Sequence, residues 1–228
     1  MITIEPSRVD FNIFAESYDR WYDTAKGEMY DRLEKDTIKE LLLNVNGKKL
    51  LDVGSGTGHW SQFFSEEGFT VTGVDISPEM VKIASKKNVR NALFAITDAH
   101  NLPFENGTFD VSAAITSLEF VRNPAGVIHE MVRCTRQPNG KLILGVLNCC
   151  ASINRKRKIK GDKFYLNARF FSPSQLGNLL APYGKPKIIS TAFVPTMEGL
   201  LFLAPLLNKI GRLLHSPTGA FIIGSVEL

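Results

Sequence analysis

No long uninterrupted apolar run occurs in the 228-residue sequence. The longest apolar stretch, residues 199–214, is broken by Pro205, Asn208 and Lys209, so it cannot supply the roughly 20 apolar residues that a membrane-spanning helix needs. The first residues also lack the basic start and the apolar segment of a secretory signal peptide. We therefore expect no transmembrane segment and a cytoplasmic location.

Cysteine is scarce as well. The three cysteines, Cys134, Cys149 and Cys150, have no metal-ligand spacing, and an odd count with an adjacent pair does not fit a secreted disulfide framework. The sequence also contains no internal repeats and no low-complexity tracts. It therefore predicts no metal site and a single domain over residues 1–228.

Acidic residues are rare in the second part of the chain. Residues 1–132 have a net charge of −7 and residues 133–228 a net charge of +11, which together give the +4 of the whole chain. Basic residues are densest in RKRKIKGDK, residues 155–163. Such a run could attract phosphates or anionic lipid, but we favour a solvated surface loop for it.

Apolar runs alternate with helical patterns along most of the chain. Helices are expected at 11–43 (two helices), 57–67, 77–87, 123–136, 172–184 and 198–214, and strands at 48–54, 69–76, 91–99, 109–117, 140–148, 185–193 and 219–228. The strand runs are continuously apolar, as buried parallel strands are. This alternation is typical of an α/β, Rossmann-like fold with helices on both faces of the sheet.

Three glycines at alternate positions follow the first predicted strand. Gly54, Gly56 and Gly58 stand in LLDVGSGTGHW, and glycine is used where the backbone takes a positive φ or approaches a ligand closely. A dinucleotide fingerprint would need its third glycine at His59, and a phosphate-binding P-loop would need a lysine that this stretch lacks. The loop therefore predicts a ligand without a phosphate fingerprint, and nicotinamide-dependent reduction is disfavoured.

Polar residues also follow the second and third predicted strands. Asp75 ends the second strand, where a carboxylate can accept hydrogen bonds from two ribose hydroxyls. Asp98 and Ala99 follow the third strand, where polar groups could bind the edge of an adenine and apolar groups its face. Together with the glycine loop, these positions fit the binding of a dinucleotide or of a nucleoside.

Four motifs occur in order along this pattern: Asp52-Val-Gly-Ser-Gly-Thr-Gly58, Gly73-Val-Asp75, Asp98-Ala-His-Asn-Leu-Pro-Phe104 and Phe109-Asp110. Together they resemble the class I S-adenosylmethionine-dependent methyltransferases, and the D-A-x-x-L-P-F segment is similar to that of members acting on small molecules. The resemblance implies a seven-stranded mixed sheet of order 3-2-1-4-5-7-6 with the last strand antiparallel. It also implies an N-terminal helical cap over about residues 8–43 and a core over about 44–228.

The resemblance implies S-adenosylmethionine as the cofactor. In this assignment the glycine loop admits the methionine part, and Asp52 holds the loop or, through water, binds the amino group. Asp75 binds the ribose, and Asp98 and Ala99 bind the adenine. The candidate cofactor-binding residues are Tyr18, Trp21, Asp52, Gly54, Ser55, Gly56, Gly58, Asp75, Ile76, Asp98, Ala99 and Thr116. Tyr18 and Trp21 belong to the predicted cap, where they could cover the cofactor and exclude water or could only pack a helix onto the sheet.

The sequence says less about the residues that bind or activate the acceptor. Glu119, after the fourth predicted strand, is the catalytic candidate because it could position an acceptor or take a proton; a helix cap or a surface carboxylate is the alternative. His59 could lean toward the cofactor. A nucleic-acid acceptor is disfavoured because no Asn/Asp-Pro-Pro-Tyr segment follows the fourth strand. Residues 198–214 are expected to pack on the sheet, with peripheral membrane contact as an alternative.

We therefore predict an S-adenosylmethionine-dependent methyltransferase that transfers a methyl group to a small-molecule acceptor by direct in-line displacement. The sulfonium leaving group is already activated, so orientation and desolvation can supply much of the catalysis. The alternative is a non-catalytic S-adenosylmethionine-binding or partner-binding protein. The acceptor, the methylated atom and the oligomeric state remain open.

Overall fold

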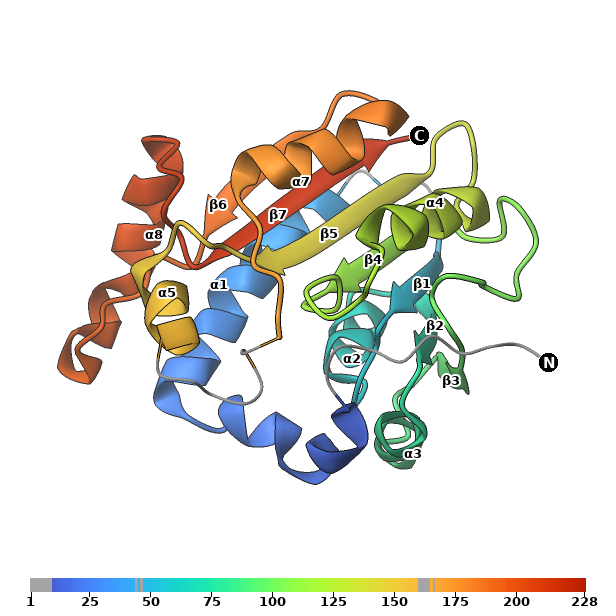
Figure 1. Cartoon of the computed structure of the whole chain (residues 1–228), viewed down its shortest axis with the longest axis horizontal. Coiled ribbons are helices and arrows are strands. Elements are labelled where there is room, and N and C mark those ends of the chain that lie inside the picture. Colours follow the sequence, from blue (N-terminus) through green and yellow to red (C-terminus); the bar gives the residue numbers. More distant parts are fainter. Residues whose placement is uncertain (1–9, 44, 46, 160–164, 166) are drawn as a thin grey trace.

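The computed structural model describes residues 10–43, 45, 47–159, 165 and 167–228. They contain one mixed sheet in the order β3-β2-β1-β4-β5-β7-β6. β7 is antiparallel to both of its neighbours, and the other pairs are parallel, which confirms the predicted sheet (Figure 1). The strands are β1 (Lys49–Val53), β2 (Thr70–Asp75), β3 (Ala92–Ile96), β4 (Val111–Ile115), β5 (Lys141–Leu147), β6 (Lys187–Thr191) and β7 (Phe221–Glu227).

Helices cover both faces of the sheet. The α-helices are α1 (Ala25–Leu42), α2 (His59–Glu66), α3 (Pro78–Lys86), α4 (Pro124–Cys134), α5 (Ser152–Ile159), α7 (Pro173–Leu180) and α8 (Ala204–Leu213). Short 3-10 helices are η1 (Phe11–Ile13), η2 (Ala15–Trp21), η3 (Ala181–Tyr183) and η4 (Glu198–Leu203). Side chains of α1 and α2 join one core cluster, and those of α4 and α7 join another.

Successive residues of the central strands enter opposite clusters. In β1, Leu50 belongs to the cluster of α1 and α2, whereas Leu51 and Val53 belong to that of α4 and α7. This follows from the two-residue period of a strand. Because both faces are covered, every described residue of β4 and β5 is buried, which explains the continuous apolar runs in the sequence.

The N-terminal segment before α1 is built from 3-10 turns. The predicted helical span of 11–43 is divided into η1, η2 and α1. Thr24 causes the division, because its backbone is extended and its side chain caps α1 by accepting a hydrogen bond from Gly27 N. Figure 1 shows this segment beside α3 at the lower edge of the molecule.

The basic run does not form the predicted surface loop. Arg155 through Ile159 belong to α5, so the loop prediction is wrong there, and residues 160–163 lie outside the described residues. Asn154 anchors the helix: it is fully buried, and its amide donates to the carbonyl oxygens of Asn148 (2.9 Å) and Ala220 (2.7 Å). A buried amide with two backbone partners pins the helix to the sheet.

Residues 198–214 lie beside β6, but large apolar side chains do not make the packing. The buried residues of α8 are Ala204, Asn208 and Gly211, while Leu206 and Leu213 are 56% and 74% exposed. The predicted packing on the sheet is therefore confirmed for the face of α8 that carries its small residues and Asn208. It is wrong for the leucines of the helix, which remain exposed. Among the described residues, no helix has the length and apolar character required to span a bilayer.

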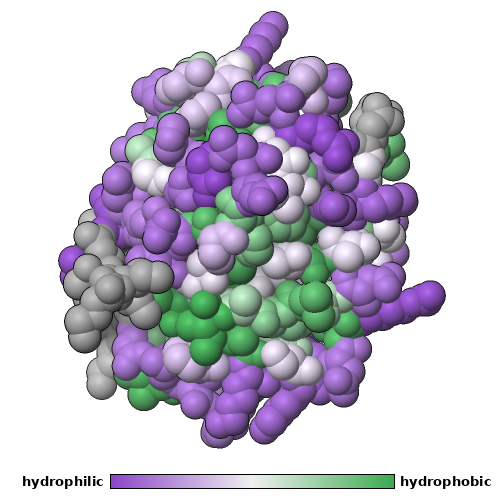
Figure 2. Space-filling model, turned by 90° about the vertical axis from the view of Figure 1, so that its right-hand side faces the viewer, coloured by the Kyte–Doolittle hydropathy of each residue, from purple (hydrophilic) through white to green (hydrophobic). Residues whose placement is uncertain are grey.

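β3 forms one edge of the sheet. Figure 2 shows hydrophobic side chains gathered on this side of the molecule. Leu93 and Ile96 of β3 are 76% and 53% exposed. The predicted strand at 91–99 is therefore only partly buried.

Asp110, just before β4, fixes the entry into β1. Its Oδ2 accepts from the backbone N–H groups of Lys48 (2.9 Å) and Lys49 (3.0 Å). We expect Asp110→Ala to lower the free energy of unfolding by about 2 kcal/mol, because two N–H donors lose a charged acceptor. Urea unfolding measures the loss. The exposed carboxylate Glu105 provides the control: an equal loss in Glu105→Ala would contradict this role.

Candidate functional site

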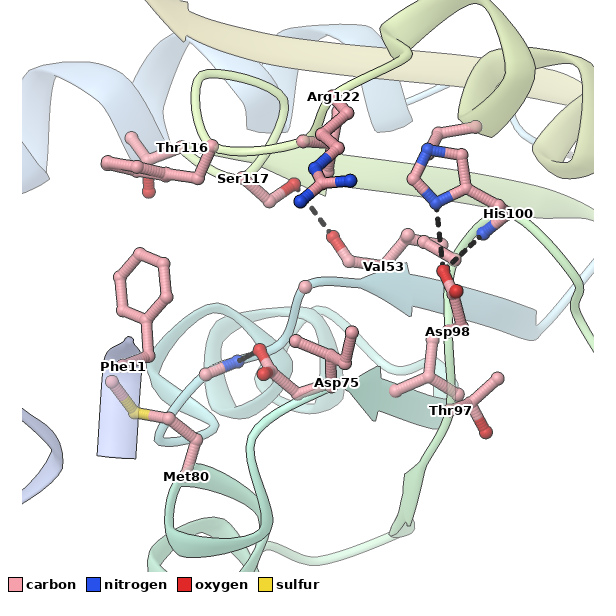
Figure 3. Close-up of a pocket in the computed structure, with 18 of the residues that line it drawn as sticks. Phe11, Val53, Asp75, Met80, Thr97, Asp98, His100, Thr116, Ser117 and Arg122 are labelled. Atoms are coloured by element: carbon pink, nitrogen blue, oxygen red, sulfur yellow. Dashed lines mark hydrogen bonds and ion pairs between the residues drawn. The ribbon is translucent and has the colours of Figure 1, made fainter. Parts of the chain in front are cut away.

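The glycine loop after β1 has the left-handed backbone expected from its sequence. The φ angles of Gly54, Gly56 and Gly58 are 73°, 53° and 81°. A Cβ on Gly54 would come within 2.3 Å of the Ser117 Cβ, whereas one on Gly56 would meet only the Met80 sulfur, at 4.0 Å. The backbone at Gly56 therefore opens into a cavity at the carboxyl ends of β1, β2 and β4 (Figure 3).

Asp75 connects this loop to the end of β2. Its Oδ2 accepts from Gly56 N at 2.8 Å (Figure 3), and its Oδ1 accepts from Ser77 N at 2.9 Å. Burial raises the pKa of Asp75, which the backbone hydrogen bonds oppose. A carboxylate oxygen has more than one acceptor site, so both oxygens can still accept a further hydrogen bond.

Asp98 and His100 follow β3, the neighbour of β2, and line the same cavity. Asp98 Oδ1 accepts from His100 N at 2.9 Å and lies 2.8 Å from His100 Nδ1 (Figure 3). The other ring nitrogen of His100, Nε2, is buried and has no hydrogen-bond partner among the described residues. An orphaned polar atom in a cavity wall is a place where a ligand group can bind.

The structure brings most of the predicted cofactor residues to this first cavity. Those that line it are Tyr18, Gly54, Gly56, Asp75, Ile76, Asp98, Ala99 and Thr116. Phe11, Met80 and Phe120 also line it and were not expected. Nothing in the local sequence indicated Phe11 or Phe120, because an isolated aromatic residue equally fits a core position.

The other predicted residues of the glycine motif lie behind the cavity wall. Asp52 is 1% exposed, and its Oδ2 accepts from Ser61 Oγ at 2.6 Å. Burial raises the pKa of Asp52 to about 7. Gly58 begins α2 as its N-cap, and Ser55 is buried within the loop. Asp52, Ser55 and Gly58 thus shape the loop and its helix without lining the cavity.

Thr116 and Tyr18 lie between this cavity and a second one. Thr116 has a φ of 50°, which is strained for a β-branched residue and is typical of functional sites. The Tyr18 hydroxyl forms a hydrogen bond with the Thr116 side chain, although burial raises the pKa of Tyr18 more strongly than this bond lowers it. The bond therefore joins η2 to the end of β4 at the boundary of the two cavities.

The second cavity has a volume of about 390 Å³ and an aromatic wall. It shares Tyr18, Thr116 and Phe120 with the first cavity. Trp21, predicted to bind the cofactor, lines this cavity and not the first. The remaining lining residues are Phe14, Ser17, Tyr22, Tyr30, Asp31, Glu34, Leu147, Arg157, Tyr165 and Ala220. Sequence reasoning assigned no role to the charged members of this set.

Glu119 lies beneath the site and lines neither cavity. It is 0% exposed, so the alternative of a surface carboxylate is wrong. Its Oε1 accepts from Leu147 N at 2.6 Å and thereby links the end of β4 to the end of β5. Burial raises the pKa of Glu119 to about 8.

His59 does not lean toward the first cavity. Its ring stacks on Tyr22 with 3.7 Å between ring centroids, and its Nε2 lies 2.7 Å from Asp31 Oδ1. Lys35 Nζ lies 3.0 Å from the same His59 nitrogen and 2.7 Å from Asp31 Oδ2. The interpretation of His59 as a neighbour of the cofactor is therefore wrong.

Comparison with known proteins identifies the family. Residues 51–144 match the family described as methyltransferase domain. An uncharacterized protein of Methanocaldococcus jannaschii is 32% identical over 183 residues, which cover 79% of this chain and 83% of that protein. A crystal structure from Thermotoga maritima, described as an S-adenosylmethionine-dependent methyltransferase and possible histamine N-methyltransferase, has a TM-score of 0.70 and 25% identity, with 94% and 96% of the two chains covered. The chain is a class I S-adenosylmethionine-dependent methyltransferase.

A further relative is the demethylmenaquinone methyltransferase of Tropheryma whipplei. It is 32% identical to this methyltransferase over 136 residues, which cover 59% of this chain and 56% of the relative. The chain thus spans little more than half of that relative. S-adenosylmethionine is the cofactor of the family, and the chain is an enzyme, so the alternative of a non-catalytic binding protein is not supported.

Gly56 provides a test of the first cavity. We expect Gly56→Ala to weaken the binding of S-adenosylhomocysteine about tenfold or more, because the added methyl group would occupy the open side of the loop. Gly68→Ala is the matched control, since Gly68 also has a positive φ of 93° and lies outside the cavity. Calorimetric titration gives both affinities. Equal affinities for the two variants would show that Gly56 does not face the ligand.

Glu119 makes the stability of the methyltransferase depend on pH. With its pKa raised from 4.5 to about 8, the folded state retains a proton that the unfolded state loses, so this contribution is complete below pH 4.5 and disappears as the pH rises through about 8. We expect the free energy of unfolding to fall between these values by up to about 5 kcal/mol more in the native protein than in Glu119→Gln. Denaturant unfolding across this range tests it, with Glu105→Gln as the exposed control. Parallel curves for native protein and Glu119→Gln would refute it.

Proposed function

We propose that this methyltransferase transfers the methyl group of S-adenosylmethionine to a small molecule bound in the second cavity. The observation that carries the proposal is the shared boundary of the two cavities, formed by Tyr18, Thr116 and Phe120. A donor in one cavity and an acceptor in the other would meet at this boundary. A cavity of about 390 Å³ lies within the size of ordinary small-molecule pockets, about 300–1,000 Å³.

The residues of the first cavity fit S-adenosylmethionine. The open backbone at Gly56 gives room for the methionine part, and the remaining acceptor sites of Asp75 suit ribose hydroxyls. Asp98 and Ala99, with the orphaned Nε2 of His100, would border the adenine. These positions follow the D-x-G-x-G-x-G and D-A-x-x-L-P-F motifs, which supports membership of the group acting on small molecules.

The chain would catalyse the transfer mainly by orientation and exclusion of water. When bound, S-adenosylmethionine supplies an activated methyl group. Tyr18 and Thr116 would orient the acceptor at the boundary, and Phe120 would help to keep water out. Glu119 would act as a positioning residue, since it holds Leu147 and lies outside both cavities.

The names of the similar proteins give two acceptor chemistries. The Tropheryma whipplei relative is named for demethylmenaquinone, and the Thermotoga maritima structure is described as a possible histamine N-methyltransferase. A ring compound or an amine is therefore the first acceptor class to assay. Nucleic acid is not favoured, because no Asn/Asp-Pro-Pro-Tyr segment follows β4.

Transfer of a radioactive methyl group tests the proposal. The purified chain is incubated with labelled S-adenosylmethionine and a panel of phenols, quinols and aryl-alkyl amines, demethylmenaquinone included. We expect one class to accept the label and Trp21→Leu to raise its KM about fivefold or more, with unchanged binding of S-adenosylhomocysteine, because Trp21 lines only the acceptor cavity.

Phe202→Leu is the matched control, since Phe202 is an aromatic residue that is 72% exposed and outside both cavities. Its KM is expected to remain that of the native enzyme. Binding of S-adenosylhomocysteine without transfer to any acceptor would contradict the proposed function. A loss of cofactor binding in Trp21→Leu would instead show that Trp21 contributes to the cofactor site, as the sequence predicted.

A further inference from the structure

We propose that the acceptor carries an ammonium group, which is bound by the carboxylate of Glu34 and the aromatic wall of the second cavity. This inference rests on the proposed function, since it assumes that the second cavity holds the acceptor. Glu34 lies on α1 and Tyr30 lies one turn before it on the same helix, so both can face the same cavity. Trp21 and Tyr18 contribute further rings from η2.

The Glu34 carboxylate lacks a partner of its own. No hydrogen bond or ion pair joins it to any residue within the described ranges, although it is partly buried and lines the cavity. Burial raises the pKa of Glu34 to about 8, and the nearby Asp31 charge adds to this effect. A carboxylate in such surroundings gains most from a cation that enters the cavity.

The neighbouring carboxylate, Asp31, differs from Glu34 because it has partners within the protein. Asp31 also lines the cavity, but Lys35 Nζ and His59 Nε2 each lie 2.7 Å from one of its oxygens. The hydrogen bonds and charges of His59 and Lys35 outweigh the burial of Asp31 and lower its pKa. The cation site of Asp31 is therefore filled by the protein itself, whereas that of Glu34 is left to a ligand.

The aromatic wall already holds one cation. The guanidinium of Arg157 lies 5.2 Å from the ring centroid of Trp21 and 5.2 Å from that of Tyr165. Such distances are typical of cation–π interactions, so these ring faces present the negative potential that attracts cations. Arg157 opposes the rise of the Glu34 pKa but forms no ion pair with it. It donates to Asn154 Oδ1 at 3.0 Å, a bond that holds it on α5.

A carboxylate without a partner and a set of ring faces together select for a positively charged group. A neutral hydroxyl would gain little from the rings, and an anionic acceptor would be repelled by Glu34 whenever its carboxyl is ionised. An ammonium group gains from the carboxylate and from the rings at once. The chemistry of the wall therefore favours an amine over a quinol or a carboxylic acid.

Binding of matched probes tests this inference. The native protein, saturated with S-adenosylhomocysteine, is titrated by calorimetry with phenethylamine, benzyltrimethylammonium, 2-phenylethanol and 3-phenylpropionate at about pH 9, above the pKa of Glu34. We expect both cations to bind at least about tenfold more tightly than the alcohol, and the anion to bind most weakly. In Glu34→Gln, the affinity for both cations should fall about tenfold while that for the alcohol stays within about twofold.

Glu28→Gln is the control, because Glu28 is an exposed carboxylate on the same helix and lies outside the cavity. The alcohol affinity reports whether Glu34→Gln preserves the cavity. Equal affinities for amine and alcohol, preferred binding of 3-phenylpropionate, or no binding of any probe to the protein saturated with S-adenosylhomocysteine would each overturn the inference. Failure of S-adenosylhomocysteine itself to bind would overturn the proposed function instead.

Discussion

The hydrogen bond from Gly56 N to the Asp75 carboxylate holds together the two segments on which the rest of the site depends. It joins the loop after β1 to the end of β2 at 2.8 Å. Because Gly56 has a positive φ, the loop can turn its backbone toward this carboxylate without a side chain in the way. The second Asp75 oxygen binds Ser77 N, the N-cap of α3, so one carboxylate positions both the loop and the next helix.

Local sequence signals were sufficient for the loop after β1 and for Asp75, whereas Phe11 and Met80, which also line the first cavity, carried no such signal. The glycines, Asp75 and the cap formed by Ser77 and Pro78 act through residues a few positions away or through neighbouring parallel strands. The turn before β5 is a similar case, since Asn139 has a positive φ of 76°, which asparagine tolerates. The strand order follows because such a sheet has few topologies once its strands and helices alternate.

The residues that line the second cavity could not be predicted from the sequence in the same way. Glu34 and Arg157 approach one cavity from α1 and α5, and no pattern along the chain indicates that these helices meet there. The basic run looked like a solvated loop because its charges suggested exposure, whereas Asn154 anchors it as a helix through distant backbone carbonyls. Trp21 was assigned to the cofactor for a related reason: a cap residue can face either cavity, and only the fold of η2 decides which.

The charges of the cofactor and of the proposed acceptor link the first cavity to the second. A bound sulfonium is positive, so an acceptor that carries an ammonium group beside the shared boundary would be repelled unless carboxylates offset the combined charge. Asp75 faces the first cavity and Glu34 the second, and the carboxylate of Asp31 is already compensated by Lys35 and His59. Asp75 and Glu34 would therefore divide the task, one on each side of the Tyr18–Thr116 boundary. After methyl transfer the cofactor product is no longer a cation, and Asp75 would then keep its ribose contacts without having to offset a neighbouring charge.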